Sequence, residues 1–320
     1  MKSFSRISLA LTVALLLLAV AAQAGRRYEE TKTYEAKELV EVNTVSGNLI
    51  VKVGESDEII VELEHSVRPT DNYEPRFRER GNAIELSERF HGSSNGSSYW
   101  TVTVPSETRI RFSTASGNLT VEGLNSVVDA NLASGDIEIY SSNGDFDLST
   151  ASGNIEFDSC TGIFDLSTAS GNIRVVRCSG DFDLSVASGS IRASDCRGGF
   201  DLSTASGSVR ASDIIIKDRS SFSSASGSAY VTLAESSEHD LVVSSASGKA
   251  ILDYSGHPIK GFFEFVARDR HGRIDAPFDF DDEVKFRRHG DRYVRKSFAL
   301  DGDTPEIRLE TASGTAALRK

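Results

Sequence analysis

A triplet, Ala-Ser-Gly, recurs along this chain of 320 residues at a fixed interval of 18 residues. Chains with a short fixed repeat stack similar units on one another, because a single unit cannot bury its own apolar face. The glycines that close the evenly spaced triplets are Gly117, Gly135, Gly153, Gly171, Gly189 and Gly207. The interval loosens toward Gly227 and Gly248, and a late copy ends at Gly314. The repeat predicts a stack of coils with about 18 residues in each.

One whole coil can be followed in residues 164–181, FDLSTASGNIRVVRCSGD. Phe164 and Leu166 alternate with polar residues, and Ile173 and Val175 do the same after the turn, which is the pattern of half-buried strands. Ser-Gly-Asn and Ser-Gly-Asp predict turns, since glycine tolerates a positive φ and asparagine or aspartate can hydrogen-bond its own backbone. Each coil should contain two short strands. The chain is therefore predicted to be an all-β, single-stranded β-solenoid with elaborated end caps.

Two other architectures have coils of similar length. A left-handed hexapeptide helix needs an apolar residue at every sixth position, but Asn154 stands six residues after Leu148. A calcium β-roll repeats Gly-Gly-x-Gly-x-Asp, whereas this repeat has one glycine in each turn. The calcium-binding mechanism of the roll is unsupported, although its flattened two-sheet shape agrees with the pattern.

Stacking of the coils should place equivalent residues above one another, about 4.8 Å apart. An interior aromatic ladder is predicted from Phe146, Phe164, Phe182 and Phe200. Three cysteines share another position of the repeat, namely Cys160, Cys178 and Cys196. They are interpreted as small buried residues at a turn, and a disulfide between two neighbouring coils is the alternative.

The first residues are typical of a secretory signal. Lys2 and Arg6 lead into an apolar run over residues 7–20, which is too short for a comfortable membrane span. Ala22-Gln23-Ala24 is a small-x-small cleavage site, and the residue after it is not the cysteine of a lipoprotein. We predict a signal peptide over residues 1–24, cleaved near Ala24, and a periplasmic or secreted mature chain without a transmembrane segment. An uncleaved anchor is the alternative.

The remaining residues, 25–320, are predicted to form one solenoid domain. Residues 25–110 are assigned to an N-terminal coil and cap, residues 111–255 to the regular repeats, and residues 256–320 to a C-terminal cap and final coil. The caps are predicted from sequence that departs from the repeat. A solenoid needs them, because its open ends would otherwise expose unpaired strand edges.

The charge of the chain excludes several classes of partner. With 35 Lys and Arg against 47 Asp and Glu, the formal net charge is −12. Nucleic acids and anionic membrane surfaces select basic proteins, so neither is a predicted partner. The histidines lack the spacing of zinc ligands, and no serine stands in a Gly-x-Ser-x-Gly motif. No catalytic residue, metal site or cofactor is predicted.

The candidate binding residues are five aspartates that share one register on an outward face. They are Asp129, Asp147, Asp165, Asp183 and Asp201. Carboxylates about 4.8 Å apart repel by about 1 kcal/mol even at the dielectric of water, so a divalent cation or a cationic partner would relieve the repulsion. The alternative is a solvated face that keeps the sheet from associating with another sheet. Calcium sites need many oxygen ligands, and this requirement favours the alternative. The opposite sheet carries Arg174, Arg192 and Arg210, which are interpreted as a contact for an acidic glycan or as another solvated row.

Several motifs resemble one bacterial family. They are VTVPSETRIRFSTASGNLTVEG at residues 102–123, the Ser-Gly-(Asp/Asn) turns, and LETASG at residues 309–314. The family consists of secreted β-strand-repeat proteins, a domain of unknown function that carries an adhesin label, and the resemblance extends over residues 38–320. It implies a β-solenoid at the cell surface or in the periplasm, and it supplies no catalytic residue. Some relatives are associated with responses to envelope stress.

The function predicted from these features is that of a non-enzymatic, exported envelope protein. It would act as an adhesin or binding scaffold for a cell-surface glycan, an envelope protein or a cationic peptide. One alternative is an envelope-stress sensor that captures cationic peptides. Another is a polysaccharide-acting β-helix enzyme, whose acid and base groups would have to come from the two irregular segments.

Overall fold

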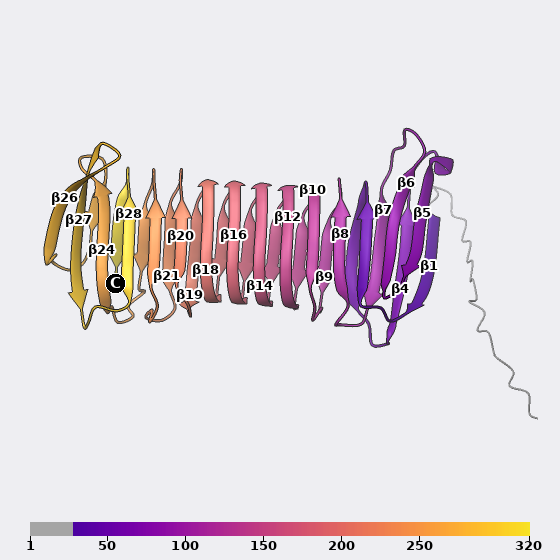
Figure 1. Cartoon of the computed structure of the whole chain (residues 1–320), viewed down its shortest axis with the longest axis horizontal. Coiled ribbons are helices and arrows are strands. Elements are labelled where there is room, and N and C mark those ends of the chain that lie inside the picture. The colour runs from indigo at the N-terminus through magenta and orange to yellow at the C-terminus, as the bar shows by residue number, and fades with distance from the viewer. Residues whose placement is uncertain (1–27) are drawn as a thin grey trace, which may run out of the picture.

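The computed structural model describes residues 28–320, which form one long stack of β-coils (Figure 1). The predicted signal peptide lies outside the described residues. Among residues 28–320 the only helix is η1, a single 3-10 turn over Thr70–Asn72, and every other regular element is a strand. No helix in this range is long and apolar enough to cross a membrane. The all-β solenoid predicted from the repeat is confirmed.

Each regular coil gives one strand to each of two parallel sheets. Sheet I contains β8 (Arg109–Thr114), β10 (Val128–Ser134), β12 (Asn143–Ser152), β14 (Thr161–Ser170), β16 (Ser179–Ser188), β18 (Arg197–Ser206), β20 (Ser220–Ser224) and β22 (Leu241–Ser245). Sheet II contains β9 (Leu119–Glu122), β11 (Ile137–Tyr140), β13 (Ile155–Asp158), β15 (Ile173–Val176), β17 (Ile191–Ser194), β19 (Val209–Ile216), β21 (Ala229–Leu233) and β23 (Ala250–Asp253). The two strands of a coil are unequal, since β14 has 10 residues and β15 has 4.

The core between the sheets contains the aromatic ladder. Parallel pairing of β14 with β16 places Phe164 opposite Phe182, and their ring centroids are 4.6 Å apart. The rings of Phe182 and Phe200 follow at 4.9 Å. Phe157 of sheet II meets the edge of this ladder, with its centroid 5.2 Å from that of Phe164. The predicted ladder is confirmed, and it joins the two sheets through one packed interior.

Close stacking of the backbone explains the glycine of each Ala-Ser-Gly triplet. A Cβ atom on Gly153 would overlap the carbonyl oxygen of Gly135, and one on Gly171 would overlap that of Gly153. Neither Gly153 nor Gly171 has a φ in the left-handed region, so the conformational freedom expected from the sequence is not the reason at these positions. Other glycines of the same column do have a positive φ, as the sequence predicts, for example Gly135 (143°) and Gly189 (149°). Non-glycine residues of the second turn, such as Arg177 (52°), are left-handed as well.

The residues around this glycine satisfy the backbone groups of neighbouring coils. The hydroxyl of Thr168 donates to the carbonyl oxygen of Gly153 at 3.0 Å, and Thr204 makes the same bond to Gly189 at 2.9 Å. On the other side of the glycine, the amide nitrogen of Asn172 donates to Oδ1 of Asn154 at 3.0 Å. The repeated threonine and asparagine are thus coil-to-coil hydrogen-bonding residues.

The N-terminal cap converts the parallel stack into antiparallel strands. Its inner coil is β2 (Leu39–Thr44) and β3 (Gly47–Val53), which pair on one side with β8 and β9. On the other side they pair in parallel with β6 (Ala83–Phe90) and β7 (Ser98–Val104). The outer strands are antiparallel and comprise β5 (Tyr73–Arg80), β4 (Glu58–His65) and β1 (Tyr28–Glu35).

Glu88 of β6 holds this cap together. Its carboxylate accepts hydrogen bonds from Tyr73 Oη at 2.9 Å, Trp100 Nε1 at 3.2 Å and the amide nitrogen of Val45 at 3.0 Å. The hydroxyl of Ser98 also donates to it. The carboxylate therefore links the outer hairpin to both the inner coil and β7.

At the C-terminal end the chain runs outward and then returns. The outward segment is β24 (Gly261–Arg268), β25 (Arg273–Asp275), β26 (Asp282–Arg288) and β27 (Asp291–Leu300). The returning coil is β28 (Glu306–Thr311) and β29 (Thr315–Arg319). β28 inserts between β22 and β24, and it places Ile307 opposite Leu241. The late Ala-Ser-Gly copy therefore belongs to a coil that lies inside the cap.

Candidate functional site

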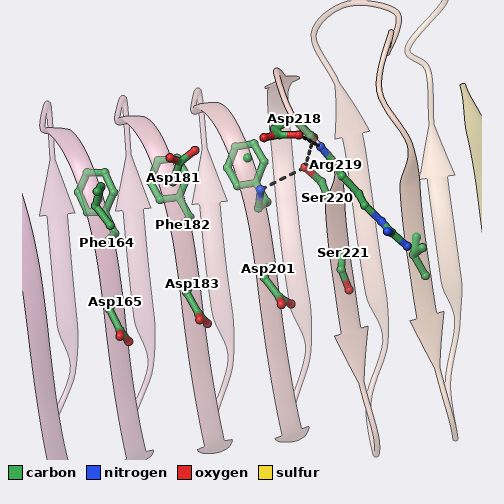
Figure 2. Close-up of a pocket in the computed structure, with 14 residues that line it drawn as sticks. Phe164, Asp165, Asp181, Phe182, Asp183, Asp201, Asp218, Arg219, Ser220 and Ser221 are labelled. Carbon is green, nitrogen blue, oxygen red and sulfur yellow. Dashed lines mark hydrogen bonds between the residues drawn. The ribbon is translucent and has the colours of Figure 1, made fainter.

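The structure stacks the five candidate aspartates in one column on the outer face of sheet I. Strand pairing places Asp129 opposite Asp147, and the same register continues without interruption to Asp201. Their neighbours in sequence, such as Phe164 and Leu166, point into the core and are buried. Figure 2 shows Asp165, Asp183 and Asp201 in line on neighbouring strands. We call these five residues the aspartate ladder.

The two ends of the aspartate ladder differ in charge. At the first end, Arg111 lies opposite Asp129, and its Nε is 3.4 Å from Asp129 Oδ2. Asn131 also donates to Asp129, at 3.1 Å. At the last end, Asp201 lies opposite the uncharged Ser221. The ladder is thus partly neutralised at Asp129 and keeps its charge toward Asp201.

The pKa of Asp147 reflects both burial and the charges of its neighbours in the ladder. Partial burial raises the pKa of this carboxyl group, and the charges of Asp165 and Asp129 on either side raise it further. A partner with positive charge would favour the ionised form and oppose this shift. Within residues 28–320, no three His, Cys, Asp or Glu side chains are arranged to hold a metal ion.

A hollow of about 600 Å³ opens beside the charged end of the ladder. Asp165, Asp183 and Asp201 line one side, and Asp181 and Asp218 lie across from them (Figure 2). Phe164, Phe182 and Phe200 also line the hollow, although their side chains are buried in the core. Ile163, which is 54% exposed, borders the hollow as well. The site combines carboxylates with the exposed hydrocarbon of Ile163 and one guanidinium group, that of Arg219.

The hollow exists because the side chain at one position of the sheet I strands differs from coil to coil. The residues in register there are Asp145, Ile163, Asp181 and Gly199. Gly199 supplies no side chain, and the loop at Asp218 lies beyond it. That loop is held by the Ser220 hydroxyl, which donates to the carbonyl oxygen of Asp218 at 2.9 Å and accepts from the amide of Phe200 at 3.1 Å. This column is not among the candidates predicted from the sequence, although its four residues follow the 18-residue period.

The three cysteines are buried and unbridged, as the first interpretation of the sequence holds. Cys160 and Cys178 lie in neighbouring coils, and the backbone amide of Cys160 donates to Sγ of Cys178 at 3.4 Å. Burial raises the pKa of the Cys196 thiol. A buried, protonated thiol is a poor nucleophile, so Cys196 is suited to packing.

Together, the parallel coils and the continuous side-chain columns define a β-solenoid with a regular, rigid face. Residues 37–261 match the family described as Toastrack DUF4097, and the chain belongs to this family. A comparison with curated proteins finds no match.

Solved structures of similar proteins share low sequence identity with the chain. One is a "putative cell adhesion protein" from Clostridium sporogenes, at 10% identity and a TM-score of 0.27, covering 92% of this chain and 99% of its own. Another is a "putative adhesin" from Bacteroides fragilis, at 11% identity and a TM-score of 0.34, covering 92% and 98%. A third, from Parabacteroides distasonis, has 11% identity and a TM-score of 0.37 over the same shares.

Proposed function

We propose that the protein is an exported, non-enzymatic binding scaffold whose sheet I face holds a cationic, partly apolar peptide segment. The observation that carries the proposal is the hollow at the charged end of the aspartate ladder. Carboxylates on both sides of the hollow, with the exposed Ile163 at its border, match a segment in which basic and apolar side chains alternate. Such an extended segment presents its side chains to alternate faces with a period of two residues.

The regular coils support this role, because they hold the carboxylates in fixed positions before any partner arrives. A pre-organised site loses less conformational entropy on binding than a mobile one. Burial raises the pKa of Asp147 most, and the charges of Asp165 and Asp129 raise it further; a cationic partner would relieve that second contribution. An adhesin and an envelope-stress sensor would both use this face. They would differ only in whether the cationic segment belongs to a surface partner or to a released peptide.

Export is part of the proposal and is supported by the order of basic, apolar and small residues over residues 1–24. It is tested by the N-terminal sequence of the protein recovered from a cell envelope fraction. A chain that starts near Gly25 is expected. A chain that starts at Met1 in the cytosol would contradict export.

Binding is tested by calorimetry with a peptide of alternating lysine and valine, and with a matched peptide of alternating glutamate and valine. We expect the basic peptide to bind and the acidic peptide to fail. Asp183→Asn, at the hollow, should weaken binding about threefold, which is the size of one exposed ion pair. Asp129→Asn removes the same charge at the end already paired with Arg111, and it should change the affinity by less than this. Equal losses for the two variants, or no binding of the basic peptide, would contradict the proposal.

A further inference from the structure

A second charged column lies on the outer face of sheet II. Strand pairing places Arg174 opposite Arg192, and Arg192 opposite Arg210, on β15, β17 and β19. All three side chains are exposed. Neighbouring strands are about 4.8 Å apart, so the three guanidinium groups follow the long axis of the solenoid at that interval. We call these residues the arginine row.

The ends of the arginine row have partners and its centre has none. Arg174 Nε is 3.1 Å from Glu156 Oε1 in the preceding coil. The guanidinium carbon of Arg210 lies 5.3 Å from the ring centroid of Tyr230 in the following coil. Within the described part of the chain, the guanidinium of Arg192 makes no hydrogen bond or ion pair. A positive charge thus remains without a counter-charge on the face of an acidic protein.

Small polar residues border the arginine row on both sides. On one side stand Asn172, Ser190 and Ser208, which follow the stacked glycines. On the other side Ser194 and Ser212 lie in register on β17 and β19. Hydroxyl and amide groups both donate and accept hydrogen bonds, so they can satisfy a partner that is rich in hydroxyl groups.

We propose that the arginine row binds a linear acidic polysaccharide whose chain lies along the solenoid axis. Guanidinium groups recognise carboxylate, sulfate and phosphate groups in bidentate fashion, and repulsion among the three arginines falls when an anion lies between them. The flanking serine and asparagine columns would bond the sugar hydroxyls. A linear chain fits better than a membrane surface, because a flat anionic surface would also meet the acidic remainder of the protein.

This site is separate from the peptide site on sheet I. The aspartate ladder lies on the outer face of sheet I and the arginine row on the outer face of sheet II, so the two columns face away from each other. A partner can therefore occupy the arginine row without contacting the aspartate ladder. Failure of the peptide-binding proposal would leave this inference unaffected.

The test titrates the purified protein with oligogalacturonate, a linear chain with one carboxylate per sugar, and with a neutral oligosaccharide of the same length. We expect binding of the acidic chain, weakening with added salt, and no binding of the neutral one. Arg192→Gln should weaken binding about tenfold, the effect of losing a charged hydrogen bond. Arg192→Lys should recover part of the affinity, because it keeps the charge and loses the bidentate geometry.

The matched control is Arg89→Gln, which removes one exposed positive charge from β6 in the N-terminal cap. It should leave oligogalacturonate binding unchanged. An equal loss for Arg89→Gln and Arg192→Gln, or equal binding of the neutral chain, would overturn the proposal. Sedimentation of the protein alone at low salt provides a separate check. If the protein self-associates at low salt and Arg192→Gln abolishes this, the arginine row pairs with the aspartate ladder of a second copy, and the polysaccharide proposal is wrong.

Discussion

The regular coils and the two caps bury their interiors by different means. In the coils a few residue types recur at fixed positions. One phenylalanine column runs through four successive coils, from Phe146 to Phe200, and one glycine column continues beyond them on both sides. In the caps each contact is made once. The carboxylate of Glu88 holds the N-terminal cap, and Phe263, Phe265 and Phe298 cluster in the C-terminal cap. The coils therefore depend on a repeated fit between layers, whereas the caps depend on individual side chains that face no copy of themselves.

The largest expected effect separates a stacked glycine from a cap glycine. In Gly171→Ala the new methyl group would overlap the carbonyl oxygen of Gly153, and rigid backbone on both sides prevents relief. We expect a loss of about 3 kcal/mol or more in the free energy of unfolding. Gly290→Ala, in the turn between β26 and β27, meets no atom within 4 Å but keeps a φ of +87°. Its cost should be about 1 kcal/mol.

Guanidinium unfolding followed by far-ultraviolet circular dichroism measures both variants. Similar losses at the two positions would mean that the glycine column is required by backbone conformation rather than by stacking. That result would remove the main difference between coil and cap.

The aromatic ladder should show the next largest effect. Phe182→Ala removes a ring that is 3% exposed and stacked on both sides, so we expect a loss of about 3–5 kcal/mol. Phe286→Ala removes a half-buried ring of the edge strand β26, which stacks on Tyr293 alone. That loss should stay near 1 kcal/mol. Thermal unfolding of the two variants compares their losses of stability. Comparable losses would show that the ladder relaxes around a missing ring.

The contrast between coil and cap also explains how much of the structure could be read from the sequence. The register of Phe164, Asp165 and Leu166 follows from the 18-residue period, because parallel pairing repeats the same alignment at each layer. The Glu88 network could not be predicted, since Tyr73, Ser98 and Trp100 have no periodic relation to Glu88. Tyr73 reaches it through the antiparallel pairing of β5 with β6, and the other two reach it from β7 of the opposite sheet.

The candidate site divides in the same way. The aspartate ladder was predictable residue by residue, whereas the hollow depends on the side chain that Gly199 lacks and on the loop at Asp218. The triplet glycine shows the same division. The positive φ expected from the sequence occurs at Gly135 (143°) and Gly189 (149°). Turn chemistry is a local property that a sequence displays, but the approach of Gly153 to Gly135 appears only when two coils are stacked.

A smaller effect concerns the threonine that bonds the glycine carbonyl. Thr168→Val removes the 3.0 Å bond to Gly153 and leaves that carbonyl buried, so we expect a loss of about 1 kcal/mol. The chain offers the reverse experiment, because Val186 occupies the equivalent position of the next coil. Val186→Thr should gain stability by a similar amount, since its hydroxyl can reach the carbonyl of Gly171. Chemical unfolding of both variants tests the pair, and a loss in Val186→Thr would mean that this coil packs differently from its neighbours.

The smallest effect, and the one that separates stability from binding, concerns Asp147. Its pKa is raised in the folded chain, chiefly by burial and then by Asp165 and Asp129, so folding favours the protonated form. Its contribution to stability is therefore complete below the ordinary aspartate pKa of about 4 and is lost as the pH rises through the raised folded value. Asp147→Asn removes this loss.

At pH 7 and low salt we expect the free energy of unfolding of the variant to rise by a few tenths of a kcal/mol, a small value because the carboxyl is largely exposed. The gain should vanish at pH 3 and shrink at high salt, where the repulsion is screened. Asp303→Asn, in the exposed loop before β28, removes the same charge outside the ladder and should not reproduce this pattern. Guanidinium unfolding at pH 7 and pH 3 measures the stability of both variants. A stability loss in Asp147→Asn at pH 7 would show that the ladder stabilises the coils. The aspartates of the regular face would then serve folding rather than the binding of a cationic partner.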